Sequence, residues 1–169
     1  MYRLGLVGII ARFAISLVAV VVIQGILAFR FRVFSYFDLP LIFSVYYGFT
    51  MGKPVASTFI GSGLGLMQDS LSGAAMGMNG FTKTLIGFLA ASAGAKFNVD
   101  YPITRFFALF LFTVGDGLLV TMLGLLVGSN PGALYGGTLM SWLLTAVFNT
   151  LLGLAMFGYY DRTSDATAS

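Results

Sequence analysis

Long apolar stretches, separated by short polar breaks, run through almost the whole chain. Of its 169 residues, 58% are hydrophobic and only 9% are charged. A soluble domain of this length would not have enough polar side chains to cover its surface. Because a helix of about 20 apolar residues crosses the hydrocarbon core of a bilayer, the sequence predicts an all-α integral membrane protein.

Breaks that hold charge, proline or clusters of glycine and serine predict a compact bundle of six transmembrane helices. The predicted spans cover residues 7–29, 38–52, 54–71, 78–96, 103–127 and 135–159. They form a single membrane domain over residues 1–160, followed by a polar cytoplasmic tail at 161–169. The second span begins at Asp38-Leu39-Pro40, where aspartate can cap a helix and proline is tolerated in the first turn. A topology of five full spans, with the second span as a re-entrant segment, stays open.

The charges of the predicted loops set the orientation, because Lys and Arg accumulate on the cytoplasmic side of a membrane. With six spans and a cytoplasmic N-terminus, the C-terminus is also cytoplasmic. Arg30 and Arg32 then fall at the outer interface, where they either extend into the headgroup region or meet a partner. The net charge of +3 is scattered along the chain and gives no basic cluster for nucleic acid.

Several kinds of catalytic chemistry are excluded by composition. The chain has no cysteine and no histidine, and each of its six acidic side chains is an aspartate. Disulfides, thiol chemistry, the usual zinc sites and imidazole catalysis are therefore absent. Asp69 and Asp116 offer a carboxylate pair of the kind used by aspartic proteases, but no intramembrane-protease signature surrounds either residue. We expect no catalytic residues, no metal site and no cofactor.

Small or polar residues recur at every fourth position in the predicted third and fourth spans. These are Ser57, Gly61, Gly65 and Asp69 in the third span, and Asn79, Lys83, Gly87, Ala91 and Ala95 in the fourth. A spacing of four places them on one face of a helix, where lipid-embedded helices pack closely and hydrogen-bond. We interpret most such series as packing seams within the bundle. A seam that faces lipid would instead dock a helix of another protein, and the sequence leaves open which seam does so.

Polar side chains of different spans fall at a similar depth below the outer surface. They are Gln24, Asp69, Asn79, Lys83, Asp116 and Ser141. Ionisable groups at this depth are costly and need partners. We expect Lys83 to pair with Asp69 across the turn at 70–78; a patch read by a partner protein and a site for a small ligand or ion are the alternatives. Asp116 lacks a nearby basic residue on its own helix and either has an unusual role or sits protonated against Ser141.

The residues around this turn resemble the signature of the MreD family of bacterial rod shape-determining membrane proteins. The matching elements are Gly61-x-x-x-Gly65-x-x-x-Asp69, Leu71-Ser72-Gly73, Gly77-Met78-Asn79-Gly80 and Gly87-Phe88-Leu89-Ala90. Gly80 stands where alanine is usual, Phe88 stands where tyrosine is usual, and Asp38-Leu39-Pro40 is a weaker match to the start of the family's second span.

The resemblance implies a non-enzymatic, multi-pass subunit of the cell-elongation complex in the bacterial inner membrane. Such subunits bind MreC, a single-pass membrane protein, and support RodA and its class B penicillin-binding transpeptidase in lateral peptidoglycan synthesis. The MreB cytoskeleton is an indirect partner. The expected helix-packing or partner-binding residues are Gly61, Gly65, Asp69, Asn79, Lys83, Gly87 and Asp116.

The family is also similar in fold to the S-components of energy-coupling-factor transporters, which bind small molecules. The alternative function is therefore a small-molecule-binding transport subunit. Its support in the sequence is the predicted outer polar layer, since a ligand site needs a few convergent polar groups.

Overall fold

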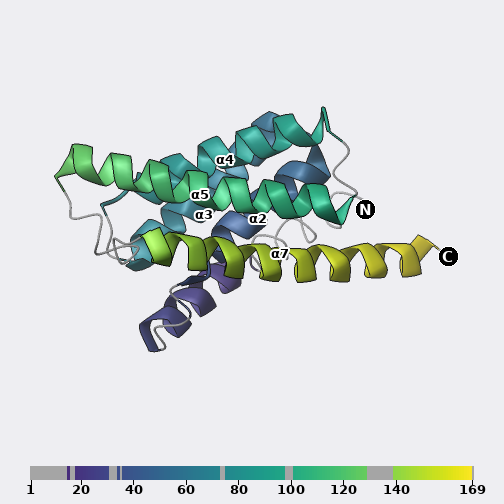
Figure 1. The fold of residues 1–169 in the computed structure, drawn as a ribbon, viewed down its shortest axis with the longest axis horizontal. Helices are drawn as coiled ribbons and strands as arrows, with labels where there is room; N and C mark the ends of the chain where they lie inside the picture. Colours follow the sequence, from purple (N-terminus) through teal and green to yellow (C-terminus); the bar gives the residue numbers. More distant parts are fainter. Residues whose placement is uncertain are drawn as a thin grey trace, which may run out of the picture.

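The computed structural model describes residues 15, 18–30, 34, 36–72, 75–97, 101–128 and 139–168, with side chains up to residue 158. The described chain is helical (Figure 1). Its helices are the segment Val18–Arg30, α2 (Leu39–Met51), α3 (Pro54–Ser72), α4 (Met78–Gly94), α5 (Pro102–Val127) and α7 (Leu139–Ala168). From α2 to α5 the bounds lie within a few residues of the ranges expected from sequence.

Two of these helices, Pro102–Val127 and the part of α7 from Met140 to Gly158, are long and apolar enough to cross a membrane. Helix α7 continues to Ala168 and includes most of the segment that we expected to form a separate polar tail. Helix α2 has 13 residues. It therefore rises about 20 Å, less than the roughly 30 Å of a hydrocarbon core, so five or six full spans both stay open. The cytoplasmic location of the termini stays a prediction.

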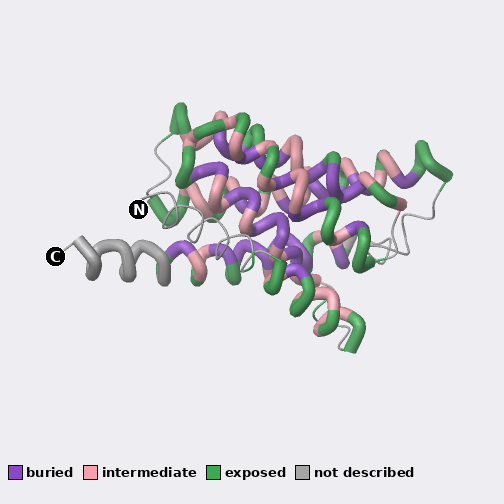
Figure 2. Tube along the Cα trace, turned by 180° about the vertical axis from the view of Figure 1, so that it is seen from behind, coloured by how far each residue is buried: buried purple, intermediate pink, exposed green. Residues whose placement is uncertain are grey.

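Helices α5 and α7 run side by side along one face of the bundle, with α2, α3 and α4 behind α5 (Figure 1). Helix α3 packs along α4, and α2 contacts each of the other numbered helices. The segment Val18–Arg30 leans away from this bundle, at the lower left of Figure 1. Buried positions gather in the middle of the bundle and exposed ones at its ends and outer faces (Figure 2).

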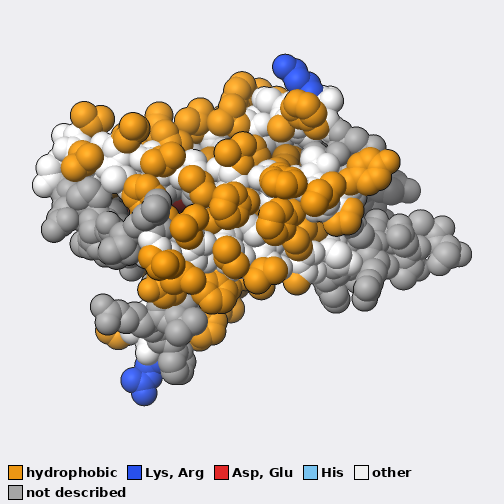
Figure 3. Space-filling view, viewed as in Figure 1, with side chains coloured by type: hydrophobic (Ala, Val, Ile, Leu, Met, Phe, Trp, Pro, Cys, Tyr) orange, Lys and Arg blue, Asp and Glu red, His pale blue; other side chains and the backbone are white. Residues whose placement is uncertain are grey.

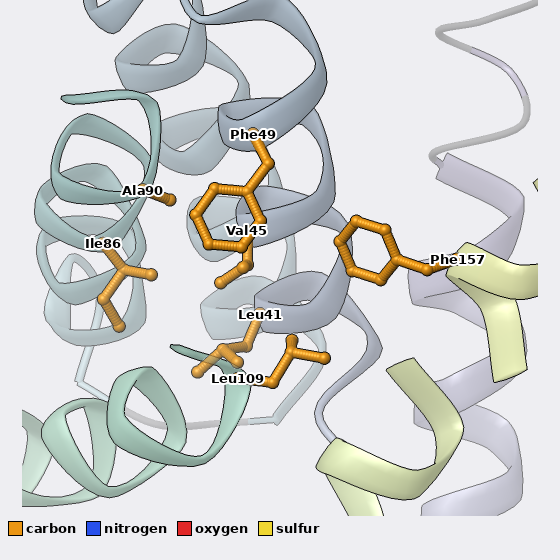
Figure 4. Packing of buried hydrophobic residues seen from close by; sticks show 7 residues of the cluster. All are labelled: Leu41, Val45, Phe49, Ile86, Ala90, Leu109 and Phe157. Carbon is orange, nitrogen blue, oxygen red and sulfur yellow. The ribbon is translucent and has the colours of Figure 1, made fainter. Parts of the chain in front are cut away.

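The apolar core lies around α2. Leu41, Val45 and Phe49 lie on one side of this helix and pack with residues from α4, α5 and α7 (Figure 4). The residues contributed by the other helices are Ile86, Ala90, Leu109 and Phe157. Because α2 is short and largely buried, its position depends on how its two ends are held.

The residues at the two ends of α2 are of types that typically start and end helices. The Asp38 side chain caps the start, where its Oδ1 accepts a hydrogen bond of 3.0 Å from the Leu41 N–H. Pro40 lies in the first turn, as expected. Gly52 ends the helix with φ of 56°, a left-handed conformation that glycine adopts without steric cost. The N-cap predicted at Asp38 is therefore confirmed.

The seam between α3 and α4 requires glycine at specific positions. A Cβ on Gly61 would overlap the backbone carbonyl of Lys83, and one on Gly65 would overlap that of Asn79. A Cβ on Gly87 would likewise meet the carbonyl of Ser57. The structure thus places these glycines inside the bundle, where they let the two backbones approach each other closely.

We predict that Gly61→Ala destabilises the protein, because the added methyl group forces α3 and α4 apart. Overpacking of this kind costs about 1–3 kcal/mol of the free energy of unfolding. Gly63→Ala is the matched control, because nothing lies within 4 Å of a Cβ at Gly63. It should be neutral or should stabilise the helix by up to about 1 kcal/mol. Reversible unfolding in mixed micelles, followed by circular dichroism, measures the stability of both variants. Equal stabilities of Gly61→Ala and Gly63→Ala would contradict the close contact between α3 and α4 at Gly61.

Candidate functional site

Lys83 lies at the centre of a buried polar network. Its side chain is 0% exposed, and its ammonium contacts three acceptors from different parts of the chain. Nζ lies 2.9 Å from Asp38 Oδ2 and 3.3 Å from Asp116 Oδ2, and donates to Asn79 Oδ1 at 3.2 Å. The ammonium donates hydrogen bonds to Asn79 and Asp116 and forms an ion pair with Asp38, so its charge is paired inside the bundle. The ion pairs link α4 to the start of α2 and to the middle of α5.

The start of α2 receives further side chains from two distant helices. The Asp38 backbone N–H donates to Asn149 Oδ1 of α7 at 2.8 Å. Gln24 Nε2 donates to the Phe37 carbonyl at 2.6 Å, and its Oε1 accepts from the Leu39 N–H at 2.9 Å. These bonds satisfy backbone groups that a helix start leaves without partners. Helix α2 is thereby fixed to the segment Val18–Arg30, to α4 and to α7.

Asp69, at the end of α3, caps the start of α4. Gly77 has no side chain and a φ of 97°, so the N-terminal N–H groups of α4 need an acceptor from elsewhere. Asp69 Oδ2 accepts from the N–H groups of Gly77 and Gly80 at 2.9 and 3.0 Å. Its Oδ1 accepts from the backbone N–H and the side-chain amide of Asn79, at 3.1 and 2.9 Å. A carboxylate is well placed here because the N-terminus of a helix favours negative charge.

Asn79 connects these two groups of contacts. Its amide Nδ2 donates to Asp69 while its Oδ1 accepts from Lys83. The predicted pairing of Lys83 with Asp69 is therefore wrong: Lys83 pairs with Asp38 and Asp116, and Asn79 stands between it and Asp69. The reason is that the backbone amides of α4 already occupy the Asp69 carboxylate.

The structure brings together Asp69, Asn79, Lys83 and Asp116 of the expected set, all of them buried. Ser141 is also buried, whereas Arg30 is exposed at the end of its helical segment. Arg32 lies outside the described residues. Asp116, which has no nearby basic residue on its own helix, finds its basic partner on α4, where Lys83 reaches it.

The sequence reading missed two participants and gave a third only part of its role. The sequence indicated Asp38 only as a helix cap, and it gave no partner for Asn149. Gln24 was placed at the right depth but given no partner. The available signal was the concentration of polar groups in otherwise apolar helices, since each intramembrane polar group needs a hydrogen-bond partner.

A cavity of about 290 Å³ lies next to this network. It is formed by the segment Val18–Arg30, the start of α2, the end of α3, the start of α4 and α7. Gln24, Asp38, Asn79, Gln68 and Thr145 contribute polar groups to its wall. Gln68 Oε1 is buried and has no hydrogen-bond partner among the described residues. The cavity is thus the place where the network meets space that a ligand can enter.

The hydrophobic surface of the bundle also indicates the class of protein. Hydrophobic side chains cover most of the face in Figure 3, and the basic side chains visible there lie at opposite edges. A helical bundle with an apolar exterior and with its ionisable groups paired inside is typical of integral membrane proteins.

The chain belongs to the MreD family, because the family model of rod shape-determining protein MreD matches residues 5–163. This is a membrane family that acts in rod shape determination. There is no significant match among curated proteins or among solved structures.

We predict that Lys83→Met is strongly destabilising, because it leaves Asp38 and Asp116 buried without their cation. Removing one partner of a buried ion pair costs about 3–5 kcal/mol. Lys96→Met is the control, since Lys96 is exposed at the end of α4. The triple change of Lys83→Met with Asp38→Asn and Asp116→Asn should recover part of the loss. Unfolding in mixed micelles measures all three, and a triple variant no more stable than Lys83→Met would argue against charge imbalance as the cause.

We also predict that Asp69→Ala loosens the hairpin of α3 and α4, because four N–H donors lose their acceptor. Each buried group left without a partner costs about 1–3 kcal/mol. The expected result is faster hydrogen–deuterium exchange at residues 75–81. Ser70→Ala is the control, since the Ser70 hydroxyl is exposed and bonds only within α3. Unchanged exchange in Asp69→Ala would show that this cap is not needed.

Proposed function

We propose that the protein is a non-enzymatic membrane scaffold of the cell-elongation complex in the bacterial inner membrane. In this role it binds MreC and supports RodA and its penicillin-binding transpeptidase in lateral peptidoglycan synthesis. MreB is contacted indirectly. The observation that carries the proposal is the match to the MreD family over residues 5–163.

The polar network supports a structural role rather than a catalytic one. Lys83, Asp38, Asp69 and Asn79 are held by one another and by helix ends, and these contacts fix the start of α2 and the hairpin of α3 and α4. A general acid or base instead needs a side chain within hydrogen-bond reach of a substrate proton. The network therefore sets the shape of the surface that partners meet.

The outer face of α5 is the surface that we propose for a partner helix. Phe107, Leu111, Leu118 and Met122 are exposed along this face. Gly115 lies between them in the helical repeat, and nothing lies within 4 Å of a Cβ placed there. Such a notch lets another helix approach the backbone closely, which is how helices associate in lipid. MreC, as a single-pass membrane protein, supplies one helix of this kind.

A transport subunit that binds a small molecule is the second candidate, and the cavity next to Asp38 favours it. Pockets of drug-sized ligands usually measure about 300–1,000 Å³, so this cavity of about 290 Å³ lies just below that range. Gln24 and Asn79 already use their side-chain amides within the protein. These features leave few groups for recognition of a vitamin-sized ligand.

We predict that MreC co-purifies with the full chain from membranes, and that Gly115→Leu reduces the recovered MreC at least fivefold. The leucine side chain fills the notch and keeps the partner helix at a distance. Cells that carry only Gly115→Leu should lose rod shape while membrane levels of the protein stay normal.

Gly158→Leu is the matched control, because nothing lies within 4 Å of a Cβ placed at Gly158 either, but Gly158 belongs to α7 and not to α5. If Gly115→Leu recovers as much MreC as the unaltered chain does, α5 is not the docking face. Failure of the unaltered chain to recover MreC, with a small molecule retained instead, would favour the transport subunit.

A further inference from the structure

The cavity next to Asp38 follows one face of the segment Val18–Arg30. The residues of this segment that line it recur every three or four positions and are Val21, Gln24, Gly25, Ala28 and Phe29. Leu71, at the end of α3, belongs to another part of the wall. The cavity is thus a gap beside the segment and the end of α3, and it extends over about two turns of helix.

The main polar side chains in the wall are already used within the protein or buried in it. Both amide atoms of Gln24 bind the start of α2, and both amide atoms of Asn79 are used within the network. The Asp38 carboxylate is buried against Lys83, and Gln68 Oε1 is buried as well. A polar ligand would therefore find few hydrogen-bond partners on the described wall, whereas a hydrocarbon chain needs none.

The cavity opens to the outside of the bundle next to Phe29. This side chain is 96% exposed and also lines the cavity. Arg30 follows directly and is exposed at the end of the same segment. Because an arginine at the end of a membrane helix extends toward the headgroups, the opening lies near the interface. The medium that surrounds this apolar opening is therefore lipid.

We propose that this cavity holds one acyl chain of a membrane phospholipid, whose head group stays outside. The chain enters beside Phe29 and runs along the segment to the level of Val21, about 12 Å deeper. A volume of about 290 Å³ takes about ten methylene groups, since each needs roughly the space of a water molecule in the liquid. In extended form, ten such groups also cover about 12 Å. A helix of a partner protein, with a diameter of about 10 Å, is too wide for this space.

The bound acyl chain would hold the segment Val18–Arg30 against the bundle. A Cβ built on Gly25 lies 3.7 Å from the Leu71 side chain, so the segment and α3 already meet beside the cavity. An empty gap leaves the apolar wall without dispersion contacts, and the acyl chain supplies them. This role goes beyond the scaffold function and does not depend on which partner the protein binds.

The test uses the full chain in phosphatidylcholine nanodiscs with a photoreactive phosphatidylcholine, which carries a diazirine either within an acyl chain or on the head group. After illumination, mass spectrometry of peptides locates the labelled residues. Val21 is the reporter, because it lines the cavity but is only 3% exposed, and Val45 of the core is the matched control. We expect the acyl-chain probe to label Val21 at least fivefold more than Val45. Equal labelling of the two valines, or labelling of Val21 by the head-group probe to the same extent, would overturn the proposal.

A variant that fills the cavity locates the bound chain. Ala28→Trp places a large side chain in the cavity and should reduce the labelling of Val21 by the acyl-chain probe at least fivefold. Ile26→Trp is the matched control, because Ile26 lies on the same segment, is 64% exposed and does not line the cavity. If Ala28→Trp leaves the labelling of Val21 unchanged, the acyl chain does not occupy this cavity. The comparison of Val21 with Val45 in the unaltered chain holds even if a variant fails to fold.

Discussion

The ion pairs of Lys83 with Asp38 and Asp116 are the interaction on which the rest of the structure depends. An unpaired charge inside a membrane bundle is costly, so these three groups constrain where α2, α4 and α5 lie relative to one another. The glycine seam serves the same arrangement, because Gly61 lets α3 approach the backbone of Lys83 itself. Lys83 is therefore the residue of α4 at which the close helix packing and the ion pairs both occur.

Helix α2 is the shortest numbered helix, yet it contacts each of the other numbered helices and lies at the centre of the bundle. Its apolar side forms the core with α4, α5 and α7, and its start is held by Gln24, Lys83 and Asn149. A helix as short as α2 has little stability by itself, so its formation and its position depend on contacts with the other helices. The polar network is therefore best understood as the structure that fixes α2, with the neighbouring cavity as the opening it leaves to the outside.

Sequence patterns predicted local features well and spatial partners poorly. The helix starts, the cap at Asp38 and the α3–α4 seam follow from spacing and from residue type, which act within one or two turns of a helix. The pairing of Lys83 did not follow. Asp69 is the nearer carboxylate in sequence, but the backbone amides of α4 had already taken it. The role of Asn149 was missed for a similar reason, because the group it holds lies 111 residues earlier in the chain.

The sequence by itself determined that this is a helical membrane protein of the MreD family, where its helices run, and that a few polar groups must meet inside it. The membrane character and the helix positions follow from composition and from periodicity, which every segment carries locally, whereas the family follows from the resemblance of the residues around Asp69 to the MreD signature. Only the tertiary structure decided that Asp38 and Asp116 share Lys83, that Asp69 caps α4, and that Gly115 is left open while Gly61 is not. The physical reason is that a charge or a glycine acts through its neighbours in space, and the packing of the helices chooses those neighbours.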